Sequence, residues 1–184
     1  MKKSILLILV VSITTGVFSQ KTEKINLDLT NALVIGQMDK TEDRYSLEVN
    51  ATELLNSRGV KAIPSLNVMK LGGNALVLAS DSIAALMAAQ GIDTYVLVSV
   101  RGFDRKFKIS GLKDNLETAL GLRSLFGLYR TDIVSISFEF KFFRGGKLVY
   151  SDMVKCGNIG DRDSVIKRFR KKVGKRIVKK WKEQ

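Results

Sequence analysis

The sequence predicts an α/β protein: a mixed sheet of about five strands with a parallel β–α–β–α–β core, an antiparallel hairpin and a packed amphipathic helix at the carboxyl end. Three observations support this. Residues 31–38 and 92–100 are apolar on both faces, which is typical of buried parallel strands. Residues 133–143 alternate between apolar and polar side chains before a Gly-Gly pair, which is typical of a hairpin. Residues 161–184 are apolar on one side of a helix and basic on the other.

A helix and a second strand follow the first of these strands. The apolar side chains of the helix repeat every three or four residues, at Leu47, Ala51, Leu54 and Leu55. Asp39 with Glu42 three residues later predicts its start, and Gly59 predicts its end. Residues 60–68 then predict a strand, which Pro64 places near an edge of the sheet because proline has no N–H to donate.

A short helix and a third strand complete the parallel core. Residues 67–80 are irregular, and Ser80 or Asp81 then caps the helix. Gly91 ends it, and its inward side is expected to contain Ile83, Leu86 and Met87. The strand at 92–100 follows. The order strand, helix, strand, helix, strand predicts parallel pairing with right-handed crossovers.

The second half of the chain predicts the antiparallel hairpin. The apolar side of residues 133–143 contains Val134, Ile136, Phe138, Phe140 and Phe142. The polar side, which we expect to face solvent, contains Ser135, Ser137, Glu139 and Lys141. Gly145 and Gly146 form a tight turn, and residues 148–154 return as the partner strand.

Residues 101–130, between these two halves, have no regular pattern. They contain a set of apolar side chains at Leu116, Leu120, Leu122, Leu125, Phe126, Leu128 and Tyr129. Gly121 and Gly127 weaken a helix there. We interpret residues 116–129 as a movable cover over one end of the sheet, or as an interaction patch that contains Leu125, Phe126 and Tyr129. Ordinary core filling is the alternative interpretation.

The amino terminus has the three-part layout of a secretory signal peptide. Lys2 and Lys3 provide positive charge, and residues 5–13 form an apolar run that is too short to span a membrane. Cleavage after Ser19 leaves a single domain at 20–184, and there is no nearby cysteine to carry a lipid. We therefore expect a soluble periplasmic or secreted protein without a transmembrane span. A buried first strand or an amphipathic anchor is the alternative.

The chain is strongly basic, with 31 lysine and arginine residues against 18 acidic ones and a formal net charge of +13. In a cytosolic protein this charge would first suggest a nucleic acid partner. An exported protein meets other counter-charges. We expect an anionic lipid or polysaccharide surface or an envelope protein as the partner, and no nucleic acid.

The closing helix carries much of this charge. Its apolar stripe covers an arc of about 160° at about 100° per residue and contains Val165, Ile166, Phe169, Val173, Ile177 and Trp181. The opposite side contains Lys167, Arg168, Lys171, Lys172, Lys175, Lys179 and Lys182. The stripe is expected to pack on the sheet, with the charges solvated. A second, compatible hypothesis is that the basic face binds an anionic surface, together with Arg101, Arg105, Lys106 and Lys108.

Residue types that serve catalysis and metal binding are scarce. The chain has no histidine and one cysteine, so the commonest general base and the thiolate or zinc clusters are excluded. Neither a nucleophile elbow nor a Walker-type phosphate loop occurs. We expect no enzymatic activity, no metal site and no cofactor. Cys156 is interpreted as a small buried apolar residue, with a reactive thiol as the alternative.

Two polar segments have structural interpretations. Residues 72–74 are glycine-rich but match no phosphate-binding pattern, so we expect a connecting loop. Carboxylates gather on the first helix at Asp39, Glu42, Asp43, Glu48 and Glu53. Arg44 stands one helical turn from Glu48, which favours a solvated, salt-bridged helix face over a catalytic carboxylate pair.

The order of these elements resembles small α/β domains of the bacterial cell envelope. The segments "RYSLEVNATELLNSRGVKAIPS" and "GIDTYVLVSV", with the turn at residues 91–93, carry the resemblance. The domains that it resembles are the amino-terminal domain of TolB, the periplasmic part of CsgG and the LpoB-like activators of cell-wall synthases. The lipid-attachment cysteine common among them is absent here. The resemblance implies a non-catalytic interaction or assembly module, and it transfers no site residues.

Overall fold

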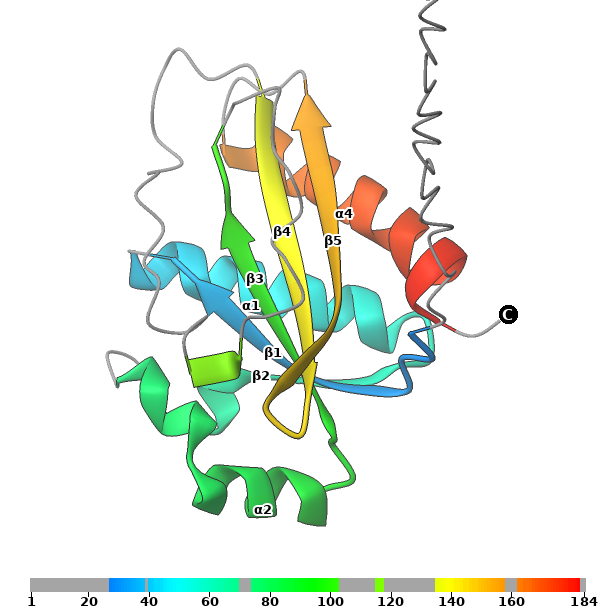
Figure 1. Cartoon of the computed structure of the whole chain (residues 1–184). Coiled ribbons are helices and arrows are strands. Elements are labelled where there is room, and N and C mark those ends of the chain that lie inside the picture. Colours follow the sequence, from blue (N-terminus) through cyan, green and yellow to red (C-terminus); the bar gives the residue numbers. More distant parts are fainter. Residues whose placement is uncertain are drawn as a thin grey trace, which may run out of the picture.

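The computed structural model describes residues 27–38, 40–69, 74–102, 115–117, 135–157 and 162–182. These residues form a five-stranded sheet in the order β2-β1-β3-β4-β5 (Figure 1). The strands are β1 (Asn31–Gln37), β2 (Lys61–Pro64), β3 (Thr94–Val100), β4 (Ser135–Arg144) and β5 (Lys147–Gly157). The longer helices are α1 (Thr41–Asn56), α2 (Asp81–Ala89) and α4 (Arg162–Arg176), which continues as a π-helical turn, η3 (Ile177–Trp181). Two 3₁₀ turns, η1 (Ser65–Asn67) and η2 (Ala75–Ala79), lie between β2 and α2.

The pairing of the strands confirms the predicted fold class. β1 pairs in parallel with both β2 and β3, while β3, β4 and β5 are joined in antiparallel fashion. β2 is the edge strand that Pro64 predicted, and it ends at that residue. The chain therefore combines a parallel core with an antiparallel hairpin in one sheet.

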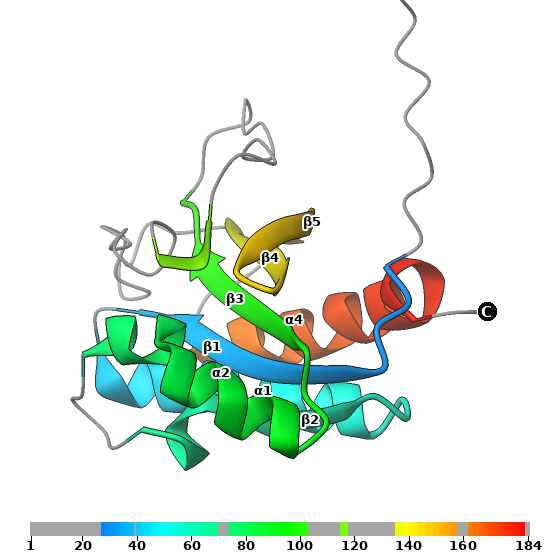
Figure 2. The ribbon, with the colours of Figure 1, turned by 60° about the horizontal axis from the view of Figure 1, so that its bottom comes forward.

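One face of the sheet is covered by α1 and α4, which lie side by side (Figure 2). The predicted stripe of the closing helix is core: Val165, Phe169, Val173, Ile177 and Trp181 are all buried. The Phe169 ring meets Phe138 edge-on at 4.9 Å and stacks on Phe140 at 6.0 Å. The Trp181 ring lies 4.8 Å from Phe140 and 5.1 Å from Phe142. Aromatic contacts at the middle of this helix and at its carboxyl end thus hold it on the sheet.

The other face carries a second core, formed with η2 and α2. Leu33, Ile35 and Leu97 of the sheet meet a set of side chains from outside it, Leu78, Met87, Ile92 and Leu116. The prediction that Leu86 points inward was wrong, since this side chain is 46% exposed. Successive residues of a helix point in directions about 100° apart. The side of α2 that packs on the second core carries Met87 and Ile83, so the neighbouring Leu86 points away from that core.

The prediction that one side of β4 faces solvent was also wrong. Ser137, Glu139 and Lys141 are only 6%, 1% and 2% exposed. Both faces of β4 are covered, because consecutive residues from Ile136 to Phe143 are buried whichever face they point to. Its charges are engaged: the Arg101 guanidinium donates to Glu139, and Lys141 has interaction partners as well. Alternation identified the two faces of the strand correctly but not their exposure.

Several predicted boundaries hold. Gly145 and Gly146 have φ values of 54° and 74°, the left-handed pair that a two-residue hairpin turn requires. Ser80 caps α2 by accepting a hydrogen bond from the Ile83 amide. The start of α1 differs, because Lys40 is the N-cap and makes no side-chain cap, while Asp39 lies outside the described residues.

Candidate functional site

The basic face of α4 projects from a helix whose other side is core. Most of its predicted members are exposed, namely Lys167, Lys171, Lys172, Lys175, Lys179 and Lys182. Arg168 is half-buried. Asp163 lies in the first turn, and Lys175 and Arg176 lie in the last, which suits the helix dipole. The charges therefore stand on a fixed support rather than on a mobile tail.

The other basic residues of the hypothesis do not join this face. Arg101 pairs with Glu139, which lies on the face of β4 opposite to the phenylalanines that contact α4. Arg105, Lys106 and Lys108 lie outside the described residues, as do Leu125, Phe126 and Tyr129 of the proposed interaction patch. Among the described residues of this hypothesis, those that gather on one surface are the basic residues of α4 and of the turn that follows it.

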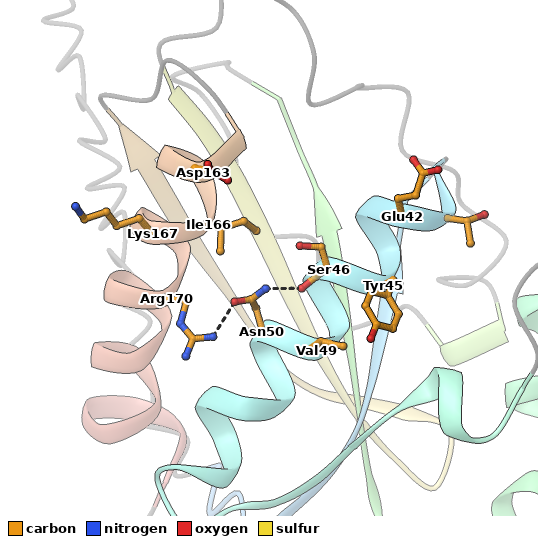
Figure 3. Close-up of a pocket in the computed structure, with 10 residues that line it drawn as sticks. Glu42, Tyr45, Ser46, Val49, Asn50, Asp163, Ile166, Lys167 and Arg170 are labelled. Atoms are coloured by element: carbon orange, nitrogen blue, oxygen red, sulfur yellow. Dashed lines mark hydrogen bonds between the residues drawn. The ribbon is translucent and has the colours of Figure 1, made fainter.

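A groove between α1 and α4 borders this surface (Figure 3). It has a volume of about 940 Å³, and its lining includes Tyr45 and Val49 of α1 and Ile166, Lys167 and Arg170 of α4. Tyr45 is 55% exposed. Periodicity had assigned Ile166 to the buried stripe, but it is half-buried and lines the groove. Tyr45 and Val49, four residues apart on the polar side of α1, were a signal of the groove that sequence reasoning missed.

Hydrogen bonds join residues that line this groove on its two helices. Arg170 Nη1 donates to Asn50 Oδ1 and to Glu53 Oε2, both at 2.7 Å. Asn50 Nδ2 donates to the Ser46 carbonyl at 2.7 Å. Arg170 therefore ties α4 to α1, and the two helices present one continuous surface.

A buried polar cluster lies at the carboxyl ends of β1 and β2, where α/β proteins often bind ligands. Glu48 Oε1 accepts from the Gly36 amide at 2.8 Å, from Arg44 Nε at 2.9 Å and from Ser65 Oγ at 2.7 Å. Glu48 Oε2 accepts from the Leu66 amide at 3.2 Å. The predicted pair of Arg44 and Glu48 exists, but Glu48 is 0% exposed, so the expected solvated face was wrong. This carboxylate joins α1 to the ends of two strands.

Cys156 is buried, in agreement with its interpretation as an apolar core residue. Burial raises the pKa of its thiol to about 11, and the nearby charges of Lys172 and Arg168 oppose this only in part. A thiol that is both protonated and inaccessible reacts slowly. Residues 72 and 73 of the glycine-rich loop lie outside the described residues.

Two further features are absent from the described residues. They contain no group of three or more histidine, cysteine, aspartate or glutamate side chains placed to hold a metal ion. Among them there is also no helix with the length and apolar character needed to cross a membrane.

Comparisons with known proteins give distant structural likenesses. No protein-family model matches the chain, and no curated protein matches it in sequence. Two solved structures of the PelC dodecamer from Paraburkholderia phytofirmans are 10% and 11% identical to it, each with a TM-score of 0.47. They cover 85% and 88% of this chain and 91% and 93% of their own. Lipoprotein GNA1162 from Neisseria meningitidis is 12% identical with a TM-score of 0.45, over 82% of this chain and 97% of its own. Such distant likenesses transfer no function, and the resemblance to TolB, CsgG and LpoB-like domains stays a prediction.

Proposed function

We propose that this chain is an exported, non-catalytic interaction or assembly module of the bacterial cell envelope, and that it binds its partner through the surface formed by α1 and α4. The observation that carries the proposal is the fixed position of α4. Because Phe169 and Trp181 are buried in the aromatic core, the exposed side of the helix is already ordered before any partner arrives. A preorganised surface loses less entropy on binding than a mobile one.

The composition of this surface favours a protein partner. The groove combines a half-exposed aromatic ring, Tyr45, with the aliphatic Val49 and Ile166 and with the guanidinium of Arg170. Aromatic and arginine side chains are enriched at protein interfaces and often dominate their affinity. The adjoining lysines would form a polar rim that attracts an acidic partner.

A second candidate function is binding of an anionic lipid or polysaccharide surface. It is supported by the exposed lysines of α4, which lie on the side of the helix away from the sheet. Each lysine that sits near an anionic membrane contributes about 1 kcal/mol, and this contribution weakens as salt rises. An interface that depends on apolar contacts in the groove should depend less on salt.

Replacing Lys171, Lys172, Lys175 and Lys179 together by glutamine separates the two candidates. The variant should unfold at nearly the parent temperature, because solvated charges add little to stability. Sedimentation with anionic vesicles should weaken by about 1 kcal/mol per lysine if the surface binds lipid. Affinity capture from envelope extracts at low and moderate salt should keep its main protein partner if the groove dominates. The matched control replaces the same four lysines by arginine. Vesicle binding equal to the parent, together with the absence of a protein that is captured at moderate salt, would refute both candidates.

Export is tested by mass spectrometry of the protein from its native host. Cleavage near Ser19 should give a mature chain that begins at or near Gln20. If most molecules still began at Met1 or Lys2, this result would contradict the envelope location, and nucleic acid would again be a possible partner.

A further inference from the structure

β5 forms one edge of the sheet. It is 11 residues long, and β4 is the only strand that pairs with it within the described part of the chain. At its first residue, Lys147, β5 also forms an isolated antiparallel bridge with Asn115. We call the side of β5 that points away from β4 its outer edge. Backbone groups along such an edge can pair with a strand from another chain.

The contacts of Met153 show which backbone groups point outward. Its amide nitrogen donates to Asp152 Oδ1 at 2.9 Å, and its carbonyl accepts from Arg176 Nη2 at 3.5 Å. In an antiparallel strand, the N–H and C=O groups of one residue point to the same side, and this side alternates along the chain. The backbone groups of Met153 therefore point to the outer edge, and so do those of Lys155. At Met153, two side chains occupy the positions that a neighbouring strand would take.

A row of positive charge from α4 accompanies this edge. α4 packs beside β5 (Figure 1), with Arg168, Lys172 and Arg176 spaced four residues apart. Arg176 reaches Asp152, with 3.6 Å between Nε and Oδ2, and the charges of Arg168 and Lys172 act on Cys156. We call these three side chains the basic row. Arg168 and Lys172, earlier in α4, lie near Cys156, and Arg176, later in α4, lies near Asp152, so the helix and the strand run in opposite directions.

The acidic group beside the row is already engaged. Asp152 is 4% exposed and accepts a hydrogen bond from Trp181 Nε1 at 3.0 Å. It also accepts a hydrogen bond from the Met153 amide and pairs with Arg176. Lys155, on the strand itself, is exposed and adds a further positive charge. The outer edge of β5 is therefore the edge of an extended strand with positively charged side chains along it.

We propose that the outer edge of β5 binds an extended acidic segment of a partner protein as an additional strand. The proposal rests on the proposed function as an interaction module and adds to it a second binding site, for which it names the chemistry of the bound segment. Residues four apart on a helix rise by about 6 Å, and alternate residues of a strand advance by about 7 Å. Carboxylates at every second position of the incoming strand would thus match the spacing of the basic row. Arg176 would leave the Met153 carbonyl, which then accepts a partner N–H, and would pair with a partner carboxylate.

The test uses the mature chain and two fluorescent peptides. One alternates glutamate and valine, and the other has the same charge but a proline in place of its central valine. The alternating peptide should bind, and the interrupted one should bind at least about ten-fold more weakly, because proline removes a ladder N–H. Binding should also slow hydrogen exchange at the Lys155 amide. Equal affinity for both peptides would overturn the proposal, since charge alone would then explain binding.

Two charge-reversal variants of the same helix locate the site. Arg168→Glu with Lys172→Glu should lower the affinity for the alternating peptide at least about ten-fold. The matched control, Lys167→Glu with Lys171→Glu, carries the same charge change one residue earlier and should lower it less than about three-fold. Equal losses in both variants would overturn the proposed site. The peptide comparison uses the parent protein, so it decides the matter even if a variant folds poorly. Failure of both peptides to bind would refute the acidic strand, while partner capture by the parent would leave the proposed function standing.

Discussion

Phe169→Ala is expected to lower the free energy of unfolding by about 3–5 kcal/mol, the range found when a buried phenylalanine is truncated. The ring is 0% exposed and lies against Phe138 and Phe140 in the core between α4 and the sheet. A domain of ordinary stability unfolds with about 5–15 kcal/mol, so this single change would remove a large part of the total. Denaturant titration followed by tryptophan fluorescence measures it, because Trp181 lies in the same core.

Val178→Ala is the control for this prediction. Val178 lies near the carboxyl end of the same closing helix, and it is 46% exposed. Its truncation should change the free energy of unfolding by less than about 0.5 kcal/mol. If Phe169→Ala were as stable as the parent, α4 would not be anchored by its aromatic stripe. The basic face would then lose its fixed support, and a free amphipathic membrane segment would become the better interpretation.

The elements predicted best from the sequence are those whose periodicity reports burial directly. β1 and β3 are apolar on both faces, and the interior of a sheet with helices on both sides is the environment that permits this. Phe169 and Trp181 fall on one side of a 3.6-residue repeat, and that side is the one that packs. The Gly145–Gly146 pair is similarly local, because a two-residue hairpin turn needs positive φ values at both positions.

The predictions that failed depend on what other parts of the chain cover. The alternation of side chains in β4 distinguishes the two faces of the strand, but it does not indicate whether other parts of the chain cover Glu139 and Lys141. The inward side of α2 was inferred from apolar character, whereas the width of its contact depends on where it crosses the sheet. Tyr45 and Val49 indicate only the α1 side of the groove. The groove itself could not be predicted, because it exists only where Tyr45 of α1 and Ile166 of α4 are brought together across more than a hundred residues.

The surroundings of Glu48 could be predicted only in part, and this residue is the subject of the second large prediction. Its spacing from Arg44 predicts an ion pair, but Gly36 and Ser65 come from separate segments and make the pair a buried cluster. Glu48→Ala is expected to lower the free energy of unfolding by about 3–5 kcal/mol, because it leaves a buried charge without its partner. The Arg44 side chain is 11% exposed, and the amide of Gly36 would lose its acceptor as well. Thermal and denaturant unfolding measure the loss.

Glu53→Ala is the matched control on the same helix. Glu53 also pairs with an arginine, Arg170, at 2.7 Å, but the two side chains are 57% and 41% exposed. Exposed pairs contribute about 0–1 kcal/mol, so this variant should remain close to the parent in stability. Equal effects of the two substitutions would contradict the buried role of Glu48. A large loss confined to Glu48→Ala would establish that α1 is held to the ends of β1 and β2 by this carboxylate. It would also mean that the Tyr45 side of the groove stands on a firmly anchored helix, since Tyr45 directly follows Arg44 in the chain.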